Sequence, residues 1–173
     1  CDMMDSKSIP NFIIVGCMKA GTTSLMHHLR NHPDIHTPPK EVHFFNRDSN
    51  YEKGVDWYKK ALEEGISHGA KVIGEKTPTY SYLDFVPERS YKQFPKTKII
   101  WVMRNPADRT YSNYLHDLKM GEENYSFERA LRNEEKRIKK NIYIGYKRRS
   151  QYVNQIKKYR QYLPKENMFF MLF

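Results

Sequence analysis

Short, nearly continuous apolar runs divide this chain into segments. The clearest are 11–16 (NFIIVG), 98–103 (KIIWVM) and 168–173 (MFFMLF), and a weaker one lies at 71–75 (KVIGE). Runs of this length, rich in β-branched or aromatic residues, are typical of strands that are buried on both faces of a parallel sheet. The pattern therefore predicts that these segments are strands of one central sheet.

Apolar side chains at helical spacing, or long charged stretches without strand character, lie between these runs. Pro106 can occupy the first turn of one such helix. The predicted helices cover 22–31, 54–64, 87–94, 106–119, 122–141 and 146–162. Strands that alternate with helices predict an α/β fold in which a parallel central sheet is flanked by helices.

Length and composition narrow the class of protein. A chain of 173 residues suits one domain, and 39% hydrophobic with 29% charged residues excludes a disordered chain. No apolar run approaches the roughly 20 residues of a membrane helix, and no signal peptide is visible. We assign 1–10 to a disordered or partly ordered N-terminal segment and 11–173 to the domain. Cys1 and Phe173 look like cut edges, so we expect the domain to be incomplete at its C-terminus.

The chain is strongly basic. Its net charge of +10 favours a polyanionic partner, such as nucleic acid, an anionic glycan or a multiply phosphorylated cofactor. Much of the excess lies in 132–158, where a solvated helix surface explains a good part of it. The two cysteines, Cys1 and Cys17, are too few for a disulfide framework, and free thiols favour a reducing compartment.

The segment 16–24 (GCMKAGTTS) joins the first strand to the first helix. Glycine permits a tight turn, and the free N–H groups and dipole of a helix start attract an anion. Lys19 adds a full charge, and hydroxyl donors come from Thr22, Thr23 and Ser24. Alone, the segment could also be an ordinary Gly-Thr helix start.

The position of the lysine separates this loop from the triphosphate-binding motif G-x-x-x-x-G-K-[ST]. Gly16 and Gly21 have the right separation, but Thr22 stands where the motif has its lysine, and Lys19 comes before the second glycine. The motif's Ser or Thr, which would hold Mg²⁺, follows that lysine directly, so without the lysine a hydroxyl here does not indicate a Mg²⁺ site. The loop therefore suits a phosphate-like group without a catalytic metal.

Five segments together resemble sulfotransferases that use 3′-phosphoadenosine-5′-phosphosulfate (PAPS). Segment 19–24 (KAGTTS) resembles their 5′-phosphosulfate loop, and 104–112 (RNPADRTYS) resembles their 3′-phosphate segment. Segments 41–45 (EVHFF), 54–58 (GVDWY) and 75–80 (EKTPTY) are similar to the branch that modifies heparan sulfate. The resemblance implies the P-loop-NTPase-like sulfotransferase fold. It also implies that a later Gly- and Lys-containing loop, which covers the cofactor in the family, would lie beyond this chain.

The resemblance implies PAPS as the cofactor, adenosine 3′,5′-bisphosphate as its product, and no metal. A strand-end arginine such as Arg104 can take a phosphate bidentately, and Ser112 can add a hydroxyl. Taken singly, Arg104 could form a surface salt bridge and Ser112 could face solvent. The implied cofactor-binding residues are Lys19, Ala20, Gly21, Thr22, Thr23, Ser24, Arg104 and Ser112.

The same resemblance implies the catalytic groups. Glu41 occupies the position of the general base, and His43 is a competing base that could instead support the loop. Lys19 and Lys76 would stabilise negative charge on the leaving phosphate. Segment 149–152 (RSQY) resembles a segment that lines the active-site cleft, and some of five aromatic residues are candidates to border the acceptor: Phe44, Trp57, Tyr58, Tyr80 and Tyr82.

The acceptor follows only from the family branch. We expect a hydroxyl or amine of a glycan, and no nucleic-acid partner, while Asn46, where several relatives carry an acid, leaves the acceptor chemistry open. A bacterial protein would be cytoplasmic and a eukaryotic one would lie in the Golgi lumen, with the cytoplasm favoured. Two other functions remain: a phosphate-loop nucleotide kinase, and a non-catalytic module that binds polyanions through its basic helices.

Overall fold

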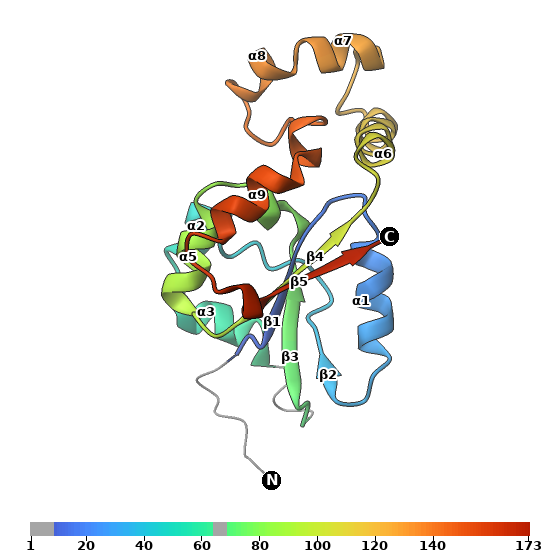
Figure 1. Cartoon of the computed structure of the whole chain (residues 1–173). Helices are drawn as coiled ribbons and strands as arrows, with labels where there is room; N and C mark the ends of the chain where they lie inside the picture. Colours follow the sequence, from blue (N-terminus) through green and yellow to red (C-terminus); the bar gives the residue numbers. More distant parts are fainter. Residues whose placement is uncertain (1–8, 64–68) are drawn as a thin grey trace.

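A computed structural model describes residues 9–63 and 69–173 of the chain. Its centre is a five-stranded parallel sheet of order β2-β3-β1-β4-β5 (Figure 1). The strands are β1 (Phe12–Gly16), β2 (Ile35–His36), β3 (Val72–Lys76), β4 (Lys98–Met103) and β5 (Met168–Leu172). The predicted α/β fold with a parallel sheet is confirmed. The two-residue edge strand β2 was not predicted, because it is too short to form an apolar run.

Helices cover both faces of this sheet. In Figure 1, α1 lies on one side, while α2, α3, α5 and α9 lie on the other. The helices are α1 (Thr22–Arg30), α2 (Asp48–Tyr51), α3 (Gly54–Lys60), α5 (Val86–Gln93), α6 (Pro106–Lys119), α7 (Phe127–Arg132), α8 (Glu134–Ile138) and α9 (Tyr152–Tyr159). Short 3₁₀ turns are η2 (Pro78–Ser81), η3 (Arg148–Ser150) and η4 (Lys165–Asn167).

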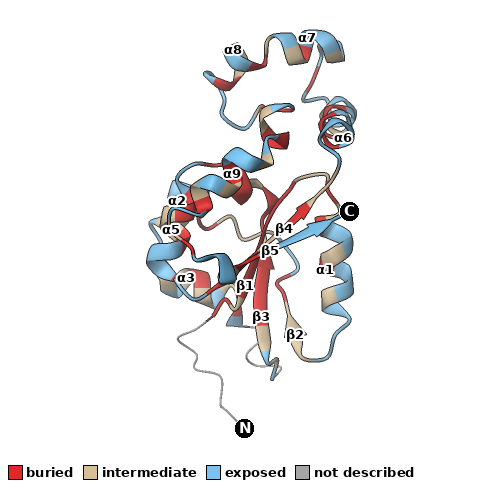
Figure 2. Ribbon diagram, viewed as in Figure 1, coloured by how far each residue is buried: buried red, intermediate tan, exposed pale blue. Residues whose placement is uncertain are grey.

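Strand β1 divides the core into two parts, because successive side chains of a strand point to opposite faces. Phe12 and Ile14 pack with Met26 in a small cluster on the α1 side. Ile13 and Val15 belong to the larger cluster on the other face. Figure 2 shows β1 and the middle of β3 buried, while β5 is mostly exposed along its length. The apolar run of 11–16 is therefore explained by burial on both faces.

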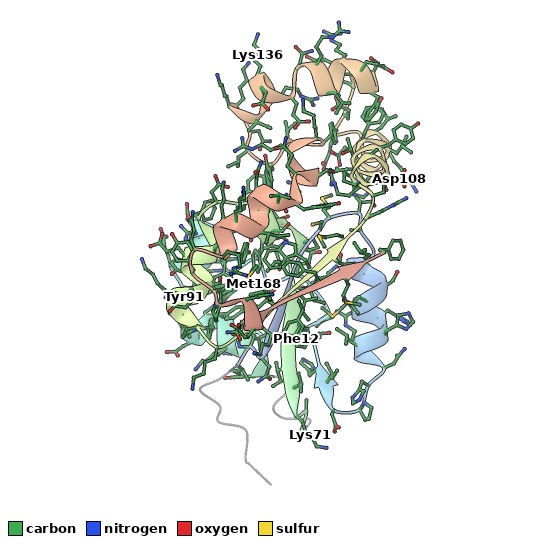
Figure 3. The ribbon with its side chains drawn as sticks, in the orientation of Figure 1. Phe12, Lys71, Tyr91, Asp108, Lys136 and Met168 are labelled. Carbon is green, nitrogen blue, oxygen red and sulfur yellow. The ribbon has the colours of Figure 1, made fainter. Side chains whose placement is uncertain are left out.

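Residues 106–150, which we call the cap, extend beyond the carboxyl ends of the strands (Figure 1). The cap has a cluster of its own, built on Tyr114, Ala130 and Tyr146. Figure 3 labels Asp108 near the start of α6 and Lys136 at the outer end of the cap. The strand ends and the cap therefore face each other across the place where an open parallel sheet binds ligands.

The predicted helix over 122–141 is wrong, because the segment forms two short helices, α7 and α8. The carboxylate of Glu123 accepts hydrogen bonds from the backbone N–H groups of Asn124 and Tyr125, at 2.9 and 3.0 Å. Ser126 then caps α7 by accepting from the N–H of Arg129. Side chains that bond to nearby backbone compete with a continuous helix.

The predicted helix over 146–162 is also wrong in its first part. Glu134 is 1% exposed and accepts hydrogen bonds from the backbone N–H groups of Tyr146, Lys147 and Arg148, at 2.8–3.1 Å. These donors are used up by a side chain, so the chain turns through η3 and the helix begins only at Tyr152.

Two predictions fall partly outside the described residues. They are the state of the N-terminal segment with Cys1, of which 1–8 are not described, and the end of the helix over 54–64, of which residue 64 is not described. Within 9–63 and 69–173, no helix has both the length and the apolar character needed to cross a membrane.

Candidate active site at the carboxyl ends of the strands

The loop after β1 presents an open helix start. Gly21 is the N-cap of α1, with a left-handed φ of 86° and no side-chain hydrogen bond to the first turn. A left-handed backbone conformation strongly favours glycine. The uncapped N–H groups of the first turn, together with the helix dipole, can hold an anion. Thr23 and Ser24 are exposed there, while Ala20 and Thr22 are buried. Burial raises the pKa of Cys17 to about 12, so its thiol stays protonated beside this loop.

Glu41, His43 and Lys76 meet next to that helix start. Lys76 Nζ lies 3.1 Å from Glu41 Oε1 and donates to Thr23 Oγ1 at 3.4 Å. His43 Nε2 lies 3.4 Å from Glu41 Oε2. The structure thus brings together a carboxylate, a lysine and an imidazole, which come from the loop at 41–47 and the end of β3. We call these three side chains, with Thr23, the reacting centre.

The imidazole of His43 is tuned by its surroundings. Burial and the charge of Arg47 lower the pKa of His43, against smaller opposing effects of Glu41 and Asn46. The neutral ring that this favours carries one N–H. It can donate to Glu41 or to Asn46 Oδ1, which lies 3.3 Å from Nδ1, but not to both.

A buried carboxylate, Glu75, supports the reacting centre from below. It is 0% exposed and accepts hydrogen bonds from Tyr58 Oη at 2.8 Å, Thr77 Oγ1 at 2.8 Å and Tyr80 Oη at 3.1 Å. Tyr80 Oη in turn accepts from the backbone N–H of Phe44 at 2.8 Å. One residue therefore ties β3, which ends at Lys76, to the loop that carries Glu41.

No site role was assigned to Glu75 at the sequence level. A glutamate inside an apolar strand was the signal that could have indicated one. Burial raises the pKa of Glu75, and the three hydroxyl donors oppose that rise.

Arg104 and Ser112 lie at the end of β4 and on α6. Asn105 caps α6 by accepting from the N–H groups of Ala107 and Asp108, and Tyr152 Oη donates to the carbonyl of Arg104 at 2.9 Å. In the described part of the chain, the side chains of Arg104, Ser112 and Lys19 form no ion pair or hydrogen bond. These three polar groups are therefore free to contact a ligand.

Arg109 fastens the loop to the cap. Its side chain is 0% exposed and donates to the carbonyl of Met18 at 3.3 Å, to Asn113 Oδ1 at 3.1 Å, and to the carbonyl of Tyr146 and Ser150 Oγ. The sequence-level prediction missed this residue, although it lies within the segment 104–112. A guanidinium with donors in several directions suits such a junction.

A cavity of about 510 Å³ opens between the loop after β1, the loop at 41–47 and the cap. Arg149 lines it from η3, rather than from a helix as expected. We call it the charged cavity; it is lined by Met18, His43, Asn46, Arg47, Thr79, Asn113, Asp117, Glu122, Tyr143 and Arg149. His43 belongs both to this cavity and to the reacting centre.

Three of the five aromatic candidates for the border of the acceptor lie in the core instead. Phe44, Tyr58 and Tyr80 are 0% exposed and belong to the large core. Phe44 stacks on Tyr58 with ring centroids 4.5 Å apart. Their rings pack in the core, and the hydroxyls of the two tyrosines donate hydrogen bonds to Glu75. Over 9–63 and 69–173, no group of three His, Cys, Asp or Glu side chains is placed to hold a metal ion.

Comparisons with known proteins agree on one family. The profile of the sulfotransferase domain matches residues 10–173. Mouse heparan sulfate glucosamine 3-O-sulfotransferase 5 is 32% identical over 164 residues, which cover 92% of this chain and 46% of that protein. Human bifunctional heparan sulfate N-deacetylase/N-sulfotransferase 2 is 37% identical over 132 residues, which cover 71% of this chain and 15% of that protein.

A solved structure extends the likeness to three dimensions. The crystal structure of a sulfotransferase from Alicyclobacillus acidocaldarius matches with a TM-score of 0.82 at 32% identity, over 94% of this chain and 72% of that one. The chain spans less than half the length of the curated relatives named above.

Proposed function

The chain belongs to the sulfotransferase domain family, and from this premise we propose that it transfers the sulfuryl group of PAPS to a hydroxyl or amine of a glycan. The observation that carries this proposal is the reacting centre. A carboxylate and a lysine lie 3.1 Å apart beside an uncapped helix start. That arrangement combines a proton acceptor with cations and N–H donors for an anionic group.

The described residues fit the two anionic ends of PAPS. The start of α1, with Lys19, Thr23 and Ser24, offers donors to the 5′-phosphosulfate. Arg104 and Ser112, whose side chains form no ion pair or hydrogen bond within 9–63 and 69–173, offer a guanidinium and a hydroxyl to the 3′-phosphate. When bound, PAPS supplies a sulfuryl group whose bond to the 5′-phosphate oxygen breaks, leaving its electron pair on that oxygen, as the bond to the acceptor atom forms.

Side chains of this protein then accept the proton, stabilise the developing charge and orient the base. Glu41 accepts the proton that the acceptor hydroxyl or amine loses. Lys76 and Lys19 stabilise the charge that builds on the leaving phosphate. His43, with one N–H in its neutral form, orients the carboxylate of Glu41, from which its Nε2 lies 3.4 Å away.

The acceptor class rests on the relatives. Both curated relatives named above modify heparan sulfate according to their names, and the net charge of +10 suits an anionic chain. A glycan acceptor is therefore part of the proposal, and we place the protein in the cytoplasm if bacterial and in the Golgi lumen if eukaryotic.

A transfer assay with labelled PAPS and the full-length protein tests this proposal. We expect Glu41→Gln to lower the transfer rate by about 10²–10⁴-fold, because a general base contributes that much. Its affinity for adenosine 3′,5′-bisphosphate should stay within about twofold, since Glu41 takes part in proton transfer and not in holding that product. Glu52→Gln, which removes an exposed carboxylate, is the matched control and should leave both quantities unchanged.

Two results would overturn the proposal. One is full transfer activity in Glu41→Gln. The other is Mg²⁺-dependent binding of ATP in place of PAPS, which would indicate a nucleotide kinase; the position of Lys19 before Gly21 argues against that function.

A further inference from the structure

The two anion sites that the proposed function requires lie at the ends of neighbouring strands. The loop after β1 leads to the start of α1, while Arg104 and Ser112 follow β4, which pairs with β1 in parallel (Figure 1). A ligand with a 5′ and a 3′ anionic group has to contact both sites at once. The affinity gained from two linked contacts depends on how well the span of the ligand matches the distance between the sites. A residue that fixes this distance therefore acts on affinity without touching the ligand.

Arg109 connects the two sites. It lies on α6 between Arg104 and Ser112, and it precedes Ser112 by three residues, so the two are neighbours on the helix surface. Its Nη1 donates to the carbonyl of Met18 at 3.3 Å, and Met18 directly precedes Lys19 in the loop after β1. A side chain from the helix that carries Ser112 thus holds the backbone of the loop that carries Lys19.

The guanidinium of Arg109 is fixed from several sides. Nη1 also donates to Asn113 Oδ1 at 3.1 Å, Nη2 donates to the carbonyl of Tyr146, and Nε donates to Ser150 Oγ. A planar guanidinium whose three nitrogens all have acceptors, from separate segments of the chain, is held in one position. The carbonyl of Met18 is therefore bonded to a rigid group.

Stability alone does not explain the charge of Arg109. Its four acceptors are uncharged, and none of the ion pairs within 9–63 and 69–173 includes it. Burial lowers the pKa of Arg109 to about 10, so it remains a cation at neutral pH. The charge of Glu134 opposes this shift, but its carboxylate bonds to backbone N–H groups. A buried cation without a paired carboxylate costs free energy, which indicates a role beyond packing.

The loop after β1 needs support at this point, because its backbone is strained at the next residue. Lys19 has a left-handed φ of 63°, which residues other than glycine rarely adopt. Such conformations persist only where the surrounding structure imposes them. The bond from Arg109 fixes the backbone on one side of Lys19, and Gly21 turns it on the other. Loss of that bond would let the loop shift relative to α6.

We propose that Arg109 is a positioning residue that sets the distance between the 5′ and 3′ anion sites, by holding the carbonyl of Met18 against α6. Arg109 is buried and contacts neither anion itself. The inference rests on the proposed function, because only a ligand with both anionic groups depends on that distance. It predicts a loss of affinity for a nucleoside bisphosphate that neither monophosphate shows.

Three nucleotides test the inference: adenosine 3′,5′-bisphosphate, adenosine 5′-phosphate and adenosine 3′-phosphate. Their binding to the full-length protein and to its Arg109→Lys variant is titrated calorimetrically. Lysine keeps the charge but loses the planar fork that reaches several acceptors. We expect the Kd of the bisphosphate to rise about tenfold, because a mismatch in span removes part of the gain from linked contacts. The Kd of each monophosphate should change by less than about twofold, since each uses one site alone.

Three other results would refute the inference. Wild-type affinities in Arg109→Lys would show that the charge suffices and that the fork is not needed. A loss for one monophosphate as large as that for the bisphosphate would indicate direct contact with that phosphate. Equal losses for all three nucleotides would show that Arg109 supports the fold of the whole site rather than the distance between its ends.

A second variant decides the matter if Arg109→Lys does not fold. Ser150→Ala removes the acceptor of Nε and keeps the guanidinium. It should raise the Kd of the bisphosphate about threefold, within what one hydrogen bond contributes, and leave both monophosphates unchanged. An unchanged Kd of the bisphosphate in Ser150→Ala would contradict the inference. Arg132→Lys, at an exposed arginine of α7, is the control for the exchange and should change none of the three affinities.

Failure of the two proposals can be told apart. If the full-length protein transfers the sulfuryl group of PAPS, but the Arg109 and Ser150 variants affect all three nucleotides alike, only the inference on Arg109 fails. If the protein transfers nothing from PAPS and binds the bisphosphate no more tightly than the monophosphates, the proposed function fails and the inference falls with it.

Discussion

The reacting centre and the Arg104–Ser112 end of the site are built in opposite ways. At the reacting centre, Lys76, Glu41 and His43 contact one another, and the buried Glu75 supports the backbone that carries them. At the other end, the side chains of Arg104 and Ser112 form no ion pair or hydrogen bond with the residues that the structure describes. The first arrangement fixes geometry before a ligand arrives, whereas the second leaves its polar groups for the ligand. Changes at the first should therefore alter rate and stability, and changes at the second should alter affinity.

The largest effect is expected from removal of the buried support. Glu75→Ala leaves the hydroxyls of Tyr58, Thr77 and Tyr80 without their acceptor, and each buried unsatisfied donor costs about 1–3 kcal/mol. We expect the free energy of unfolding, measured by urea titration, to fall by about 3 kcal/mol or more. The transfer rate should fall by about 10²-fold or more, because small misplacements of the reacting groups are costly.

Two further variants sharpen this test. Glu75→Gln keeps an acceptor oxygen and should recover part of the stability, while Glu52→Ala, on the surface, should have no effect. If Glu75→Ala folded stably and kept its rate, the reacting centre would not depend on its support, and the contrast between the two ends would disappear.

The sequence predicted the strands better than the cap, for a physical reason. The run 98–103 matches β4 residue for residue, because burial on both faces requires an unbroken apolar segment. The segment 122–141 does not form the single helix that was predicted, because the carboxylate of Glu123 accepts hydrogen bonds from backbone N–H groups that a helix would use. Such a contact leaves no periodic trace in the chain.

The candidate site shows the same limit. Glu41, His43 and Lys76 could be named from the sequence because each lies in a segment that resembles the family. In the structure, Glu41 lies 3.1 Å from Lys76 and 3.4 Å from His43. The hydrogen bonds around the buried Glu75 could not be predicted from the sequence, because Tyr58 lies 17 residues before Glu75 in another segment. The charged cavity is likewise formed by residues from distant segments that only the fold brings together.

Lys76→Ala should give the next largest effect and should act on rate alone. Lys76 is the cation nearest to Glu41, and loss of one group that stabilises developing charge costs about 10²–10³-fold in kcat. Affinity for adenosine 3′,5′-bisphosphate should change by less than about threefold, which corresponds to about 0.6 kcal/mol and lies near the lower end of what one hydrogen bond contributes.

Lys71 is the matched control for Lys76. It lies just before β3, at the opposite end of the strand, where it pairs with Asp34 at 3.1 Å (Figure 3). Lys71→Ala should leave kcat unchanged. If Lys76→Ala lost much affinity for the bisphosphate and kept its kcat, Lys76 would act in ligand binding, like the Arg104–Ser112 end of the site, and not in the reaction.

Arg104→Ala should show the opposite signature. A charge-assisted contact to a phosphate is worth about 1.5–3 kcal/mol, so the Kd for adenosine 3′,5′-bisphosphate should rise about 10–100-fold. Binding of adenosine 5′-phosphate, which lacks the 3′ group, should not change. Arg104→Lys should recover part of the affinity, because it keeps the charge and loses the bidentate geometry. Equal losses for both nucleotides would mean that Arg104 does not contact the 3′-phosphate.

The smallest effect is expected from Ser112→Ala, which removes one neutral donor from the same phosphate. A single hydrogen bond of this kind contributes about 0.5–1.5 kcal/mol, so the Kd for the bisphosphate should rise about 2–10-fold, with kcat at saturation unchanged. Ser126→Ala, which removes a helix-cap hydroxyl far along the cap, controls for loss of a hydroxyl as such. Because Arg104 and Ser112 would share one phosphate, their combined variant should lose less affinity than the two single losses added together. Fully additive losses would show that the two side chains contact separate groups, and the Arg104–Ser112 end would then be two sites rather than one.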